Sequence, residues 1–297
     1  MTKLYHSLVR ISQSIAITSA DPSLAYLSYL PLASKSCRIK NDSDFHLALN
    51  LPKYFSNTLV DFCSYWSKVK VLELTPGVDI RVQTKISRMW TATADEYRDK
   101  LVTLCDIDMV QLDDARKKVI HQVQDNCLIQ WGFDHPSYSV SPDIGKWPMD
   151  GTSAKGHVFN QIVNPQGLSL LQAMQNWRRD NRFEVRSNPF NSFAVFSDES
   201  LLKDLLNSMS IPPKVLKISR LRIEHQLLSG RLDKADRQPF FAKLFLARRE
   251  IHEFHGPRPF NHKSKVGRLI LDQLEIKGKE YENFLENLKN ILRVELG

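Results

Sequence analysis

The chain has 297 residues, of which 42% are hydrophobic and 25% are charged, and its formal net charge is +8. This length and composition allow a substantial buried core and exclude a wholly disordered chain. The longest apolar run, residues 24–33, is interrupted by Pro31, whereas a membrane-spanning helix needs about 20 residues. Because no secretory signal is recognisable near the amino terminus, we expect a cytoplasmic protein that does not enter a membrane.

Helical patterns dominate the first half of the sequence. Asp21-Pro22 is typical of a helix start, and Pro31 is expected to bend or end that helix. Pro52 is expected to open a second helix. The clearest periodicity, with apolar residues about 3.6 positions apart, predicts a helix over residues 108–131.

Two stretches are expected to interrupt this pattern. Pro76-Gly77 predicts a turn, and residues 78–82 predict a short strand after it. Residues 132–167 contain nine glycines and prolines, which indicates a long connection between two domains.

The second half predicts helices and strands in alternation. The expected elements are a helix over 168–182, a strand over 190–196, a helix over 198–209, a basic strand over 215–223, a helix over 240–254, a strand over 266–276 and a helix over 280–294. We therefore predict an α+β protein: a mainly helical domain over 1–145, and a basic domain over 146–297 with an antiparallel sheet flanked by helices. The four cysteines form no C-x-x-C pair and are expected to be buried thiols in a reducing compartment.

The positive charge is concentrated in one segment. Residues 214–268 carry a net charge of +9, whereas residues 1–213 carry +1 and residues 269–297 carry −2. Clustered cations bind nucleic-acid phosphates by releasing counterions, so this segment predicts RNA binding; a merely solubilising surface is the alternative. The candidate RNA-binding residues are Lys214, Lys217, Arg220, Arg222, Arg248 and Arg249.

Residues 251–268 are the densest polar cluster of the chain, with three histidines, four cations, two glycines and two prolines. Cations can hold phosphates and neutralise developing charge while an imidazole attacks or carries a proton. The cluster therefore indicates either phosphate chemistry or non-catalytic binding of RNA phosphates, and the residue types fit both.

The order of features resembles the non-structural protein two family of rotaviruses. His255-Gly256, followed by His262 and a basic cluster, is similar to the family's His-Gly-Lys-Gly-His-x-Arg motif. Weaker similarities lie in residues 41–55, in Ile86-Ser-Arg88, in Arg116-Lys-Lys-Val119 and in residues 221–228. The two histidines are seven positions apart here and four in the family, so the resemblance is to a distant member.

This resemblance implies a C-terminal domain related to histidine-triad nucleotide hydrolases and assembly as a homo-octamer. It implies binding of single-stranded RNA, Mg²⁺-dependent hydrolysis of nucleoside or RNA 5′-triphosphates, and work in viroplasms of the host cytoplasm with a viral phosphoprotein and polymerase. His262 would accept the phosphate, or His255 would hold that catalytic role. The residues expected to bind the nucleotide are Arg258, Lys263, Lys265 and Arg268.

Three functions remain open on the sequence. The first is an RNA-binding NTPase that supports viral genome replication and packaging. The second is a non-catalytic RNA-binding or nucleocapsid-type protein. The third is a bacterial or phage nuclease or toxin, because histidines and cations meet phosphates in that class too.

Overall fold

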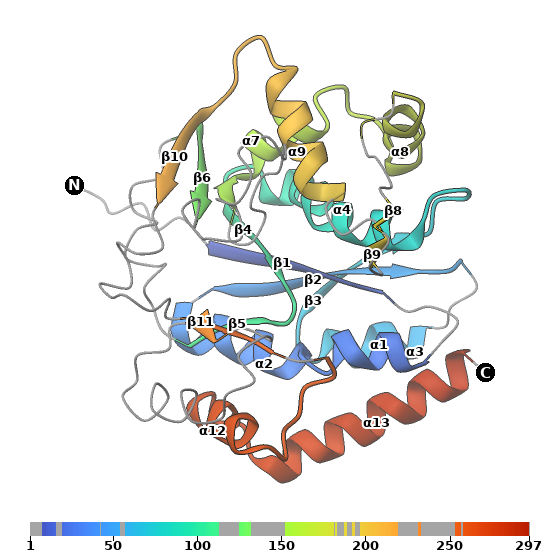
Figure 1. The fold of residues 1–297 in the computed structure, drawn as a ribbon, viewed down its shortest axis with the longest axis vertical. Coiled ribbons are helices and arrows are strands. Elements are labelled where there is room, and N and C mark those ends of the chain that lie inside the picture. Colours follow the sequence, from blue (N-terminus) through green and yellow to red (C-terminus); the bar gives the residue numbers. More distant parts are fainter. Residues whose placement is uncertain are drawn as a thin grey trace.

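A seven-stranded mixed sheet forms the centre of the computed structural model (Figure 1). The structure describes residues 8–15, 20–41, 43–53, 57–112, 125–131, 152–180, 182, 187–188, 192–193, 197–218, 231–232, 253–256 and 258–296. The strand order is β10-β6-β7-β4-β1-β2-β3. These strands are β1 Leu8–Ile15, β2 Asp44–Leu51, β3 Lys68–Glu73, β4 Leu101–Asp106, β6 Cys127–Trp131, β7 Ser153–Lys155 and β10 Lys214–Ile218.

Strands β1 to β4 run parallel and form a doubly wound half-sheet. β2 pairs with β1 and with β3, and β4 lies on the other side of β1. The chain therefore first builds outward from β1 through β2 to β3 and then returns to add β4 beside β1. The strand order reverses between β1 and β4, and such a reversal leaves a crevice at the carboxyl ends of the strands. On the far side of β4, β7 is antiparallel to both β4 and β6, and β10 is parallel to β6.

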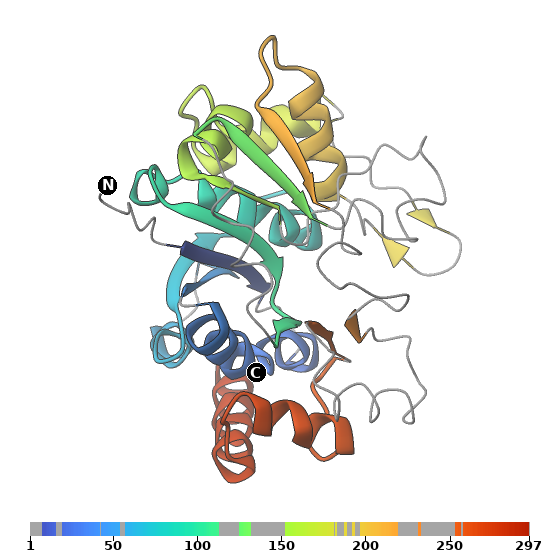
Figure 2. The same cartoon turned by 90° about the vertical axis from the view of Figure 1, so that its left-hand side faces the viewer.

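Helices cover both faces of this sheet (Figures 1 and 2). One face carries α4 Ile80–Ala92, α7 Gly156–Val163, α8 Leu170–Arg179 and α9 Ser197–Asn207. The other carries α1 Ala20–Leu27, α2 Leu30–Ser36 and α3 Asn57–Ser64, with η1 Cys37–Asn41 after α2. Beneath that layer lie α12 Lys265–Gln273 and the long α13 Gly278–Leu296. The short η2 Asp95–Tyr97 precedes β4.

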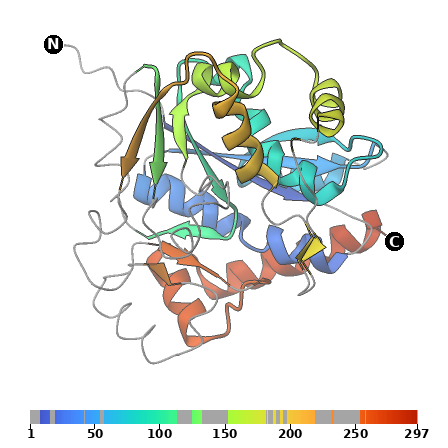
Figure 3. The ribbon, with the colours of Figure 1, turned by 45° about the horizontal axis from the view of Figure 1, so that its top comes forward.

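A small second sheet brings the C-terminal region to the end of β4. β5 Met109–Gln111 follows β4 after a two-residue turn and pairs antiparallel with β12 Glu253–His255, which pairs parallel with β11 Arg231–Leu232 (Figure 3). A further two-stranded ribbon consists of β8 Ser187–Asn188 and β9 Ser192–Phe193.

Burial on both faces explains the composition of the central strands. In β2, every residue after Asp44 is buried, and β4 is buried from Leu101 to Cys105. Strands covered by helices on both sides are expected to be continuous apolar runs instead of alternating ones. Two core clusters result: one under α1, α2, α3, α12 and α13, and the other under α4, α7, α8 and α9.

Several expectations from the sequence are confirmed. The mixed helix and strand composition is present, α1 includes Asp21-Pro22 and α13 covers the expected last helix. The turn at Pro76-Gly77 is present, with Gly77 at φ +75°. All four cysteines are free and buried. Within the described part of the chain, no helix is long and apolar enough to cross a membrane.

Other expectations are wrong, and most of the errors share one cause. The helix expected over 108–131 begins with β5 and ends with β6, and the first half contributes β1 to β6 to a region expected to be mainly helical. A short strand buried on both faces has no alternation, so its continuous apolar residues also fit a helical period. Conversely, residues 78–82 enter α4, and 266–276 form most of α12. Of the helix expected over 240–254, only residues 253 and 254 are described, and they begin β12. The break expected at Pro31 is present, because α1 ends at Leu27 and Pro31 lies in the first turn of α2.

The described part of the segment expected to connect two domains, residues 152–167, contributes to the core. The sheet contains strands from both sides of residue 145, since β7 lies between β4 and β6. Gly156, at the start of α7, lies so close to the backbone of Tyr97 that an added Cβ would be 2.2 Å from the Tyr97 carbonyl oxygen. The glycine therefore permits close packing of α7 and is no mark of a linker.

We predict that Gly156→Ala lowers the free energy of unfolding by about 3 kcal/mol, because the backbone of Tyr97 cannot move away cheaply. Gly278→Ala is the matched control, since an added Cβ at Gly278 meets no atom within 4 Å. Urea denaturation followed by circular dichroism measures both. Equal stability of the two variants would contradict the close packing of α7.

Candidate functional site

Two aspartates mark the carboxyl end of β4. Asp106 is the last residue of the strand, and Asp108 follows in the turn before β5. In the parallel ladder Asp106 lies opposite Gln13 of β1, so it stands at the strand pair where the order of the sheet reverses. This is the place at which open α/β sheets bind ligands. The side chain of Asp106 is 33% exposed, whereas that of Asp108 is fully buried.

Arg88 connects Asp106 to α9. Its side chain is 3% exposed, and its two terminal nitrogens reach Asp106 Oδ1 at 2.8 Å and Asp198 Oδ2 at 2.5 Å. Burial alone lowers the pKa of Arg88, but the two carboxylates raise it above its usual range. For Asp106, burial is the largest single effect and raises the pKa, but Arg88, Lys85 and Arg258 together lower that pKa well below normal. The group therefore stays charged.

Arg258 connects Asp108 to the C-terminal region. Its Nε donates to Asp108 Oδ2 at 2.5 Å, and its Nη1 donates to the hydroxyl of Tyr26 at 2.7 Å. The guanidinium also lies over the Tyr26 ring, 4.3 Å from the ring centre. The backbone reinforces this contact, because the N–H of Gly256 donates to the carbonyl oxygen of Asp108. Arg258 keeps 30% of its side chain exposed and can thus face a ligand.

A second pair of acids lies at the start of α9. Asp198 is fully buried and bound to Arg88, and Glu199 follows it. Burial, and after it the negative charge of Asp198, raise the pKa of Glu199 to about 8, although Lys85 and Arg88 act to lower it. Strongly shifted acids in a polar cluster are typical of functional sites. The site thus combines four carboxyl groups with the guanidinium groups of Arg88 and Arg258.

The aspartates at the end of β4 supply carboxylate oxygens, a ligand type that divalent cations prefer. Carboxylate oxygens are preferred ligands of Mg²⁺, which is commonly bound by one or two carboxylates together with the phosphates of a substrate. In the described ranges, no group of three or more His, Cys, Asp or Glu side chains is arranged to hold a metal. A cation bound by Asp106 and Asp108 would therefore need oxygens from its ligand or from water.

The residues predicted from the sequence are divided among several places. His262 precedes α12, with its ring 5.2 Å from the Tyr281 ring and its Nε2 3.7 Å from Glu282 Oε1. His255 lies on β12 opposite Met109, so its backbone is close to the end of β4. Arg258 is at the site, as described. Lys263, Lys265 and Arg268 are exposed at or on α12, and Lys214 and Lys217 are exposed on β10. Four further predicted RNA-binding residues lie outside the described part of the chain: Arg220, Arg222, Arg248 and Arg249.

Sequence reasoning missed Asp106, Asp108, Arg88 and the acids of α9. A signal was present for the first two, because an apolar run from Leu101 to Cys105 ends in two acids spaced by one residue. A buried strand with acids directly after it predicts a polar site at the edge of a parallel sheet. The helix expected over 108–131 concealed this pattern. Nothing in the sequence signals that Arg88 reaches Asp198 across 110 positions.

Comparisons with known proteins give little further information. No family model and no curated protein matches the chain. Two crystal structures of the glycosyltransferase GlyE from Streptococcus pneumoniae TIGR4 are similar, with TM-scores of 0.47 and 0.48 and identities of 12% and 11%. The similarity covers 95% of this chain, which spans 63% and 62% of the GlyE chain. A likeness at this level assigns no activity.

We predict that Arg88→Met lowers the free energy of unfolding by about 3–5 kcal/mol, because it leaves the buried Asp198 without its counter-charge. Arg81→Met on the same helix is the matched control: its partner Asp79 is at the surface, and such pairs contribute at most about 1 kcal/mol. Chemical denaturation of both variants at neutral pH gives the comparison. If Arg88→Met lowered the free energy of unfolding as little as the control does, the cluster around Arg88 would have to be solvated.

Proposed function

We propose that this chain is a divalent-cation-dependent enzyme that binds the phosphates of a nucleotide at the carboxyl edge of its sheet and cleaves the bond to the terminal group. The observation that carries the proposal is the position of Asp106 and Asp108 at the end of β4, where the strand order reverses between β1 and β4. Open α/β sheets bind ligands, nucleotides among them, at this point.

The charges around the two aspartates support this function. Arg258 is partly exposed beside Asp108, and a guanidinium can bind phosphate oxygens in a bidentate manner. Arg88 holds Asp106 from below the surface and fixes the orientation of its carboxylate. When bound by Asp106 and Asp108, a divalent cation would neutralise charge on the phosphates as the bond to the terminal group breaks.

The terminal group is either a phosphoryl or a glycosyl group. The resemblance to the viral NTPase family favours hydrolysis of a triphosphate, whereas the geometry of the two aspartates suits either group. The proposal on Asp106 and Asp108 is common to both reactions. A panel of ATP, GTP, UTP, CTP, UDP-glucose and GDP-mannose, each with Mg²⁺ or Mn²⁺, separates them by the product released.

We predict that Asp106→Asn and Asp108→Asn each weaken Mn²⁺-dependent binding of UDP or ADP at least tenfold, because each removes a carboxylate ligand. Isothermal titration calorimetry with and without Mn²⁺ measures this effect. Asp44→Asn is the control, since Asp44 is exposed at the first position of β2, at the opposite edge of the sheet. Thermal unfolding of each variant shows whether its fold is retained. Unchanged, Mn²⁺-dependent binding in both folded variants would refute the assignment.

A second candidate, RNA binding, is supported by the charge of residues 214–268. Lys214 and Lys217 are exposed on the edge strand β10, and Lys263, Lys265 and Arg268 are exposed around α12. By the resemblance stated above, this candidate extends to a homo-octamer with a histidine-triad-like domain, in which His262 or His255 accepts a phosphate from the triphosphate. His262 lies against Tyr281 and Glu282.

For this candidate we predict that affinity for single-stranded RNA falls with salt with a log–log slope near −4, as expected for about 6 neutralised phosphates. Fluorescence anisotropy between 50 and 300 mM salt, roughly the range over which such slopes are measured, gives the value. Lys214→Ala combined with Lys217→Ala should reduce the slope by about 1 to 2. An affinity for RNA that does not change with salt would contradict RNA binding by this basic segment.

The catalytic role of His262 has its own test. Unchanged NTP hydrolysis in His262→Ala would show that this histidine takes no part in catalysis.

A further inference from the structure

We propose that Glu199 is the general base of the site and takes the proton from the hydroxyl group or water that attacks the terminal group. This inference rests on the proposed function and adds to it the group that activates the attacking molecule.

Glu199 belongs to the same cluster as the proposed phosphate-binding aspartates. It is in the first turn of α9, which packs against α4. The residue before it, Asp198, is bound to Arg88 at 2.5 Å, and Arg88 is bound to Asp106 at 2.8 Å. A single guanidinium therefore connects the start of α9 to the end of β4, which places Glu199 beside the proposed site.

Three polar atoms of this cluster are buried and make no hydrogen bond within the described part of the chain: Arg88 Nε, Asp198 Oδ1 and Glu199 Oε2. Arg88 and Asp198 are 3% and 0% exposed, respectively. A buried polar atom without a partner costs about 1–3 kcal/mol, so three in one cluster are unusual for a purely structural position. A hydroxyl group or water suits them, because it donates to a carboxylate and accepts from a guanidinium.

The environment of Glu199 suits a base that works near neutral pH. The charged groups that face it are Asp198 on α9, Lys85 and Arg88 on α4, and Asp106 on β4. Burial and the negative charge of Asp198 raise its pKa to about 8, so the carboxylate holds a proton more strongly than an ordinary glutamate does. Of the two adjacent acids, Asp198 is engaged in an ion pair with Arg88, which leaves Glu199 available for proton transfer.

In the proposed transfer step, each bond that forms is matched by a bond that breaks, and the proton remains on Glu199. The carboxylate of Glu199 takes the proton from the attacking O–H, and that oxygen forms a bond to the terminal group of the nucleotide. The bond between the terminal group and the phosphate oxygen breaks, and its electron pair leaves on the phosphate. Arg258, beside Asp108, is placed to compensate this new negative charge.

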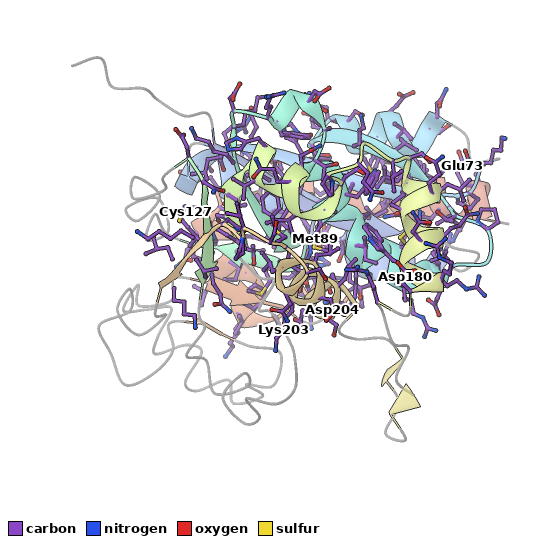
Figure 4. The ribbon with its side chains drawn as sticks, turned by 90° about the horizontal axis from the view of Figure 1, so that it is seen from above. Glu73, Met89, Cys127, Asp180, Lys203 and Asp204 are labelled. Carbon is purple, nitrogen blue, oxygen red and sulfur yellow. The ribbon has the colours of Figure 1, made fainter. Side chains whose placement is uncertain are left out.

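The test is the pH dependence of turnover between pH 6 and 9.5, with whichever donor of the panel above is turned over. In the wild type, kcat/KM should rise about tenfold per pH unit and level off near pH 8, the pKa of Glu199. Glu199→Gln should lose about 10²–10⁴-fold in kcat and the rising limb, because the amide takes no proton. Asp204→Asn is the control: Figure 4 labels Asp204 on the same helix, where it is exposed.

A second measurement separates catalysis from folding. Because the pKa of Glu199 is raised in the folded state, the free energy of unfolding falls progressively as the pH rises from 4.5 to about 8. Glu199→Gln cannot ionise, so this pH-dependent fall in stability should disappear. The variant should therefore be at least as stable as the wild type at pH 8. Glu199→Ala should recover activity with added formate, which supplies a carboxylate. Turnover in a folded Glu199→Gln with an unchanged pH profile would overturn the inference alone, whereas absence of turnover in the wild type across the panel would overturn the proposed function and the inference with it.

Discussion

The guanidinium of Arg88 is the contact on which the proposed site depends. Taking a single charge out of water costs several kcal/mol, and the cost is recovered only when well-placed opposite charges surround it. Arg88 meets this condition with two carboxylates from different elements, Asp106 at the end of β4 and Asp198 on α9. Because none of the three groups can move without leaving a buried charge, α4, α9 and the carboxyl end of β4 are fixed relative to one another.

Arg258 repeats this arrangement from the other side of the sheet. It binds the fully buried Asp108 and rests on Tyr26 of α1, so the C-terminal region is attached to the end of β4. Two neighbouring contacts strengthen the attachment, since the Phe260 N–H donates to the Ser28 hydroxyl and the Tyr281 hydroxyl donates to the Ser28 carbonyl. The two aspartates are therefore held from both faces of the sheet, and a site fixed in this way needs little rearrangement when a ligand binds.

The sequence predicted elements well where a single local signal is decisive. Pro22 near a helix start and the amphipathic period of the last helix are such signals, and both are confirmed. The sequence did not predict elements whose conformation depends on tertiary packing. Val110 and Leu128 are on strands because helices and neighbouring strands bury them on every side. The ion pair of Arg88 with Asp198 joins positions 110 residues apart, and no local pattern encodes such a distance. The acids after β4 were within reach of sequence reasoning, but only once β4 had been identified as a strand.

Folding separates the cations of the basic segment, residues 214–268, into different parts of the molecule. The segment's net charge of +9 is continuous in the sequence, yet Lys214 and Lys217 lie on β10 at one edge of the sheet, while Lys263, Lys265 and Arg268 lie around α12 in the lower layer (Figure 1). Arg258 comes from the same segment but is directed inward, to a buried aspartate. Cations that cluster along a chain can therefore serve different purposes after folding. Here the inward-facing arginine and the acids that it contacts are better placed for chemistry than the exposed lysines, because they are fixed and partly withdrawn from water, where electrostatic interactions are stronger.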